Sequence, residues 1–152
     1  MKLKKRLLPI ASLIIAFFLG GCATPPSHLI VAPEILTQTG VHHINKQATL
    51  NVIDMRTANN IVQILRKGEA AILLSAQERL ENTITNSLSK HWQQQGLTIQ
   101  DNAVNAITIA IEKALISVSQ ETLNYQAQSK IVLKVTINNN EQTLTSTFKN
   151  SG

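Results

Sequence analysis

The sequence predicts an α+β fold, an antiparallel sheet of about five to six strands with one long helix packed on one face. Two patterns carry this prediction. Apolar residues recur at every fourth position between residues 80 and 92, as they do along one side of a helix. Apolar and polar residues then alternate over long stretches between residues 107 and 148, as they do along half-buried strands. A chain of 152 residues has room for one domain of this kind.

Residues 1–21 have the composition of a cleaved export signal. Residues 1–6 are basic, residues 7–19 are almost wholly apolar, and two glycines follow. As a helix, the apolar run would be about 20 Å long, which is too short for a hydrocarbon core of about 30 Å. We therefore expect a signal peptide rather than a membrane-spanning helix.

The next residue is the only cysteine of the chain, so no disulfide within the chain and no thiolate zinc site can form. Leu19, Gly20, Gly21 and Cys22 resemble the bacterial lipobox, in which a signal peptidase recognises the first three residues. The resemblance implies that Cys22 becomes the mature N-terminus and carries an S-diacylglyceryl group and an N-acyl chain, because its thiolate is the nucleophile that accepts the lipid. Two or more acyl chains hold a protein firmly on a membrane.

Ala23 follows the cysteine, where the familiar enteric sorting rule has aspartate in lipoproteins kept in the inner membrane. That rule implies a lipid anchor in the outer membrane, facing the periplasm. Residues 22–28 would be the acylated cysteine and a short tether that Pro25 and Pro26 stiffen. Residues 29–152 would form one periplasmic α+β domain.

Several short strands are expected before the helix. Residues 29–31 read as a strand that Pro33 confines to a sheet edge, and residues 36–47 as a loop. Residues 50–55 alternate as a strand does. Residues 61–65 and 70–74 flank a turn that contains Gly68, which predicts a β-hairpin.

The helix is expected to begin at a capping box, Ser75-Ala76-Gln77-Glu78, and to end before Gly96, which suits the left-handed position after a helix. Its apolar stripe consists of Leu80, Ile84, Leu88 and Trp92. A helix of this length, about 28 Å, covers roughly half of the predicted sheet. Either a partner covers the rest or the sequence lacks a C-terminal helix.

The strands after the helix are expected to form an antiparallel meander. The apolar phase shifts between residues 107–111 and 114–118, which predicts a bulge near Lys113. Residues 125–137 alternate without interruption, residues 138–141 form a turn, and the pattern continues to residue 148.

The net charge of +5 does not indicate a nucleic-acid partner. Residues 1–21 contain four basic residues and no acidic one, so the remainder has ten basic against nine acidic residues. We expect this remainder to be nearly neutral and to bind no nucleic acid.

No catalytic, cofactor or metal site emerges from the residues. His42 and His43 are adjacent, which would point their rings to opposite sides of an extended chain, and no acidic or thiol ligand lies at useful spacing. His91 lies one residue off the apolar stripe of the predicted helix, where we expect a surface or boundary residue. Asp54 and Arg56 share a face at the end of a strand, where they could pair with each other or bind a partner. We expect neither enzyme activity nor a cofactor.

Several short motifs resemble the YajG-type lipoproteins of Gram-negative bacteria. The similar residues are Gly21-Cys22-Ala23 with Pro25-Pro26, Asp54-Met55-Arg56-Thr57, Leu74-Ser75-Ala76, Gly96 and Val118-Ser119-Gln120. The resemblance implies an envelope location, an α+β fold and no established activity. It also implies a second amphipathic helix beyond the position of Gly152, so that the sequence would be shortened at its C-terminus.

The sequence is compatible with two functions. The first is a non-enzymatic outer-membrane lipoprotein that acts as an adaptor or accessory protein for another envelope component, through a sheet face or edge. The alternative is a periplasmic binding module for a small apolar ligand or lipid. A cavity lined by Leu88, Ile109, Ile131 and Leu133 would favour the ligand, and a tight core with a bare apolar strip would favour the protein partner.

Overall fold

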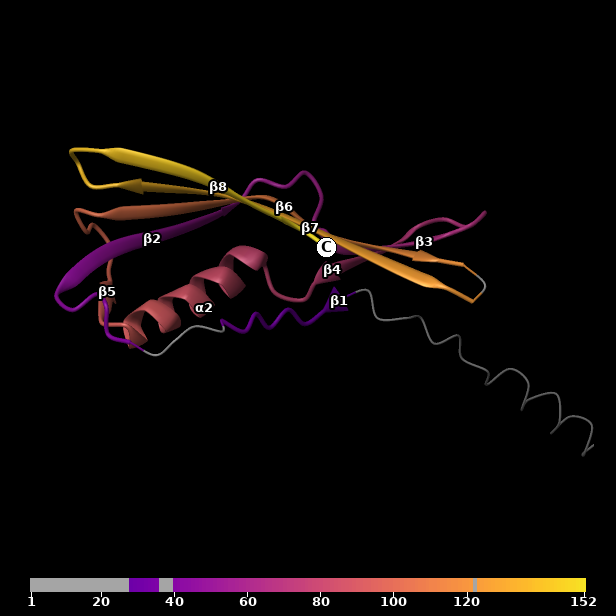
Figure 1. Cartoon of the computed structure of the whole chain (residues 1–152), viewed down its shortest axis with the longest axis horizontal. Coiled ribbons are helices and arrows are strands. Elements are labelled where there is room, and N and C mark those ends of the chain that lie inside the picture. Colours follow the sequence, from indigo (N-terminus) through magenta and orange to yellow (C-terminus); the bar gives the residue numbers. More distant parts are fainter. Residues whose placement is uncertain (1–27, 36–39, 122) are drawn as a thin grey trace, which may run out of the picture.

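The computed structural model describes residues 28–35, 40–121 and 123–152. The predicted signal peptide, most of the tether, Cys22 and residues 36–39 of the predicted loop lie outside the described residues. The described residues form one eight-stranded sheet and one helix (Figure 1). The elements are β1 (His28–Leu29), β2 (Lys46–Asp54), β3 (Asn60–Arg66), β4 (Ile72–Ala76), α2 (Leu80–Gln94), β5 (Leu97–Ile99), β6 (Ala106–Gln120), β7 (Tyr125–Asn138) and β8 (Thr143–Ser151).

Strand β6 is the central strand of the sheet. Along one edge it pairs with β7, which in turn pairs with β8. Along the other edge, residues 106–111 pair with β2 and residues 116–120 pair with β3, so that β2 and β3 lie end to end beside it. Strands β4 and β1 extend the sheet beyond β3, and β5 extends it beyond β2.

One helix packs on one face of the sheet as predicted, but the sheet is mixed, so the prediction of an antiparallel sheet of five to six strands was wrong. Four pairings are parallel: β1 with β4, β2 with β5, β2 with β6, and β3 with β6. The hairpins β3–β4, β6–β7 and β7–β8 are antiparallel, as predicted. Side chains alternate in the same way in both kinds of sheet, so the sequence pattern could not distinguish them. The helix returns the chain to the other end of the sheet, which makes β5 and β6 parallel to β2.

The start of the helix also differs from the prediction. Ser75 and Ala76 belong to β4, where they pair with β1, and so the expected capping box does not form. The helix begins at Leu80 with Arg79 at the N-cap, which makes no side-chain capping bond. The end is as predicted, because Gly96 follows the helix with φ +89° and its amide donates to the carbonyl of Gln93 at 3.0 Å.

The predicted bulge is present in β6 and keeps the apolar residues on one face. The register with β7 shifts between Ile111 and Lys113. Without the extra residue, Ala114, Ile116 and Val118 would point away from the side on which Ile109 and Ile111 lie. The bulge therefore continues the apolar face of β6 along its whole length.

The core lies between α2 and one half of this face. Helix α2 packs on β2 and β5, at the left of the molecule in Figure 1. The most buried side chains there are Ala48, Leu80, Leu97, Ile109 and Ile111. The other half of the sheet, with β1, β3 and β4, extends beyond the N-terminal start of the helix (Figure 1).

Candidate functional site

Asp54 and Arg56 lie at the junction between the two halves of the sheet. Asp54 ends β2, Asn60 begins β3, and between these two strands residues 112–115 of β6 pair with neither of them. The side chain of Arg56 occupies this junction. Its Nη1 donates to the carbonyl oxygens of Asn60 at 3.2 Å and of Ala114 at 3.3 Å. The guanidinium thus links the end of β2 and the start of β3 to the bulged middle part of β6.

The same guanidinium forms a two-pronged ion pair with Asp54. Nη2 donates to Oδ2 at 2.6 Å and Nε to Oδ1 at 2.9 Å, and the amide of Arg56 donates to Oδ1 at 3.1 Å. The side chain of Arg56 is only 8% exposed and that of Asp54 only 14% exposed. The side-chain hydrogen bond from Arg56, which outweighs the opposing effect of partial burial, holds the pKa of Asp54 below its ordinary value.

Of the two roles that the sequence leaves open for these residues, pairing with each other or binding a partner, the structure contains the pairing. The carboxylate accepts hydrogen bonds from the guanidinium and from the Arg56 amide, and the guanidinium also donates to two backbone carbonyls, so the pair joins strands. Its members are not directed at an external ligand.

A polar groove of about 600 Å³ runs from this ion pair to the start of α2. It is lined by the carboxylates of Asp54, Glu78 and Glu81, the guanidinium groups of Arg56 and Arg79, and the ring of His28. Arg79 donates to Glu81, and this hydrogen bond lowers the pKa of the Glu81 carboxyl. Four of these side chains are ion-paired within the groove, Asp54 with Arg56 and Arg79 with Glu81.

The described histidines and acidic residues form no group of three or more that could hold a metal ion. The rings of His42 and His43 meet edge to face, with centroids 6.5 Å apart. Both amides donate to the carbonyl of Gln95, which holds this segment against the end of α2. The histidine pair therefore belongs to a loop that packs on the helix end.

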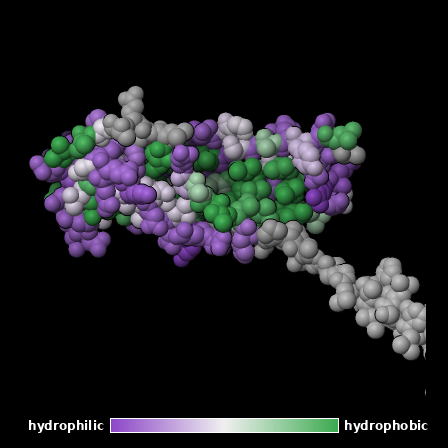
Figure 2. All heavy atoms as spheres, turned by 90° about the horizontal axis from the view of Figure 1, so that it is seen from below, coloured by the Kyte–Doolittle hydropathy of each residue, from purple (hydrophilic) through white to green (hydrophobic). Residues whose placement is uncertain are grey.

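The half of the sheet beyond α2 presents an apolar surface, here called the bare half. The pairings place six aliphatic side chains of three strands on the same face as the helix. They are Val62 and Ile64 of β3, Ile72 and Leu74 of β4, and Ile116 and Val118 of β6. Figure 2 views the molecule from the helix side and shows a continuous hydrophobic area in this half.

The apolar cavity that would favour a small ligand does not take the predicted form. Ile109 is buried in the core at 5% exposed, whereas Ile131 is 43% exposed. Four open pockets on the described part of the chain contain none of the four expected lining residues. The described domain thus has a packed core beside an uncovered apolar strip.

A second feature of the surface was not predicted. Four lysines of β6, β7 and β8 gather on the face opposite α2. Alternation alone places Lys130 and Lys134 on one side of a strand, and this signal was present in the sequence. Lys113 and Lys149 join them only through the bulge and the strand register.

No helix within the described ranges has the length and hydrophobicity that crossing a membrane requires.

Comparison with known proteins gives the family. A family described as "Uncharacterized lipoprotein" matches residues 33–152. Over 128 residues the chain is 27% identical to the uncharacterized lipoprotein YajG of Escherichia coli strain K12, and equally to that of strain CFT073; the match covers 84% of this chain and 65% of each relative. The match thus spans just under two thirds of the length of these relatives.

A crystal structure of protein XCC0632 from Xanthomonas campestris has a similar fold. The TM-score is 0.55 at 9% sequence identity, and the match covers 81% of this chain and 77% of that chain. At this identity the likeness is one of fold alone. The family match covers most of the present chain, which therefore belongs to the family of uncharacterized lipoproteins that includes YajG.

Proposed function

We propose that this protein is a non-enzymatic lipoprotein of the bacterial envelope that serves as an adaptor or accessory protein for another envelope protein. In this proposal acylated Cys22 anchors it in the outer membrane, and the folded domain faces the periplasm. Membership of a lipoprotein family, the Leu19-Gly20-Gly21-Cys22 sequence and the short tether before β1 support the anchor.

The apolar surface of the bare half is the observation that supports the adaptor role. Ile116 is 43% exposed although it lies between Val62 of β3 and the backbone of β7. A run of aliphatic side chains on three adjacent strands is typical of a sheet face that packs against another element. The bulge in β6 brings Ile116 and Val118 onto this face, and so this apolar surface depends on a specific irregularity of the strand. The other five side chains of this surface are half-buried. An apolar surface of this kind is covered either by a partner protein, as proposed here, or by the further helix that the resemblance implies beyond the position of Gly152.

Site-specific photo-crosslinking in living cells tests the adaptor role. A photo-reactive amino acid at position 116 would lie on the bare half, and the same amino acid at position 119 would lie on the opposite face of the same strand. We expect a discrete protein adduct from position 116 and none from position 119. Equal adducts from both positions, or none from either, would contradict the proposal.

The anchor has a separate test. Mass spectrometry of the mature protein should find Cys22 as the first residue with its acyl groups, and density-gradient fractionation should find it with the outer membrane. The Cys22→Ser variant should appear in the soluble periplasmic fraction. A mature protein that retains Met1, or that carries an unmodified Cys22, rules the anchor out.

A further inference from the structure

Four lysines surround Val132 on the face of the sheet opposite α2. Val132 of β7 pairs with Lys113 of β6 on one side and with Lys149 of β8 on the other. Lys130 and Lys134 lie two residues before and after it on β7, and therefore on the same face. We call these four residues the lysine quartet. All four are exposed, whereas Val132 at their centre is only 9% exposed. Aliphatic stems of lysines commonly cover an apolar neighbour in this way.

The quartet concentrates positive charge in a chain that is otherwise acidic. From Cys22 onward, the other six basic residues stand against nine acidic ones. The ion pairs among the described residues are Asp54–Arg56, Arg66–Glu69 and Arg79–Glu81, and none of them involves the quartet. Glu112 is the one carboxylate within β6, β7 and β8, and it is the extra residue of the bulge. The four ammonium groups therefore lack a carboxylate partner in the described domain.

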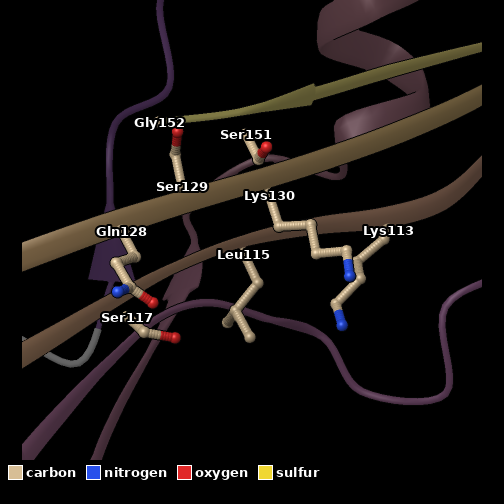
Figure 3. A pocket seen from close by; sticks show the side chains of 8 residues that line it. All are labelled: Lys113, Leu115, Ser117, Gln128, Ser129, Lys130, Ser151 and Gly152. Atoms are coloured by element: carbon tan, nitrogen blue, oxygen red, sulfur yellow. The ribbon is translucent and has the colours of Figure 1, made fainter.

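An open pocket of about 380 Å³ adjoins the quartet (Figure 3). Lys113 and Lys130 line it together with Ser117, Gln128 and Ser151. Figure 3 shows the ammonium groups of both lysines on the same side of the strands. Ammonium and hydroxyl groups are hydrogen-bond donors to phosphate oxygens, and lysine binds phosphate as a compact charge.

The layout of the quartet indicates a ligand with several phosphates spread over a surface. Neighbouring strands lie about 4.8 Å apart, so the Cα atoms of Lys113 and Lys149 are separated by about 10 Å. Lys130 and Lys134 are separated by about 13 Å along β7. Four charges at these spacings on an open sheet face can each meet the phosphate of a neighbouring lipid headgroup in a bilayer.

We propose that the lysine quartet binds the phosphates of anionic lipid headgroups and turns this face of the sheet toward a membrane. The bare half, on the opposite face, then points away from that membrane. The proposal rests on residues of the folded domain and holds whether or not Cys22 is acylated.

The test uses the mature chain from residue 22 with Cys22→Ala, so that no acyl chain contributes. Co-sedimentation is measured with vesicles of phosphatidylcholine alone and of phosphatidylcholine mixed with phosphatidylglycerol. We expect binding to the mixed vesicles only, and its loss at high salt. Each lysine near an anionic surface contributes about fivefold in affinity, so Lys113→Gln with Lys149→Gln should weaken binding about 25-fold.

The matched control is Lys46→Gln with Lys90→Gln, two exposed lysines outside the quartet whose loss changes the net charge equally. This variant should bind almost as well as the parent. Equal weakening in both double variants would show a net-charge effect and overturn the proposal, as would absence of binding to the mixed vesicles. Saturable binding of inorganic phosphate without vesicle binding would also overturn the lipid assignment. Acylation of Cys22 is assayed separately, so either proposal can fail alone.

Discussion

Arg56 holds the carboxylate of Asp54 through two side-chain hydrogen bonds, Nη2 to Oδ2 at 2.6 Å and Nε to Oδ1 at 2.9 Å. Its remaining guanidinium nitrogen reaches the carbonyl oxygens of Asn60 and Ala114. The end of β2, the start of β3 and the bulged part of β6 are thereby joined by one side chain. This junction connects the half of the sheet that α2 covers to the bare half.

Removal of Arg56 should therefore destabilise the fold strongly. Arg56→Ala leaves the mostly buried Asp54 carboxylate and two backbone carbonyls without their donor, and we expect a loss of about 3 kcal/mol in the free energy of unfolding. Glu69→Gln, which removes a partner of the exposed Arg66–Glu69 pair, should cost less than about 1 kcal/mol. Urea unfolding of both variants measures the difference. A similar small cost for both would show that the junction does not stabilise the sheet.

The same pair makes stability depend on acid pH. The side-chain hydrogen bond from Arg56 lowers the folded-state pKa of Asp54 below its ordinary value of 3.8, so the folded state binds the proton less readily than the unfolded state. The stabilisation is complete well above pH 3.8 and is lost as the pH falls through the lower, folded pKa. Asp54→Asn should therefore be less stable than the parent at neutral pH, and the gap should close in acid. A gap in urea midpoint that stays constant with pH would contradict this prediction.

Two glycines with positive φ should respond differently to alanine. Gly68, in the β3–β4 turn, has φ +77° and open space where a Cβ would lie, so Gly68→Ala should cost only the backbone strain of about 1 kcal/mol. At Gly96, with φ +89°, a Cβ would also lie 3.0 Å from Cγ1 of Val41 and 3.3 Å from the amide nitrogen of Ile44. Gly96→Ala should therefore cost about 2 kcal/mol or more. Similar losses of thermal stability in the two variants would show that the contact with the 41–44 loop is unimportant.

Local pattern predicted the hairpins, the bulge and the end of the helix because each depends on residues close together in the chain. It placed the helix start wrongly because Ser75 and Ala76 have a non-local alternative, pairing with β1. The three-residue strand β5 was missed because so short a strand has no period of its own and exists through its pairing with β2.

At the candidate site, too, one contact could be predicted from local pattern and another could not. Asp54 and Arg56 are two residues apart on a strand end, so their pairing could be predicted from alternation. The carbonyl of Ala114, which Arg56 also contacts, is 58 residues away, and the parallel pairing of β2 and β3 with β6 brings it there. No periodicity in the sequence encodes which strands become neighbours.

The distribution of charge shows most clearly which features depend on the sequence alone and which depend on the tertiary structure. The sequence by itself determined that four of the basic residues lie in the first 21 positions and that the rest of the chain is almost balanced, because composition needs only counting. Only the tertiary structure decided that four of the remaining ten basic residues share one face. The bulge in β6 and the register of β7 with β6 and β8 bring Lys113 and Lys149 to either side of Val132, because residues far apart in the chain meet only where backbone hydrogen bonds align their strands.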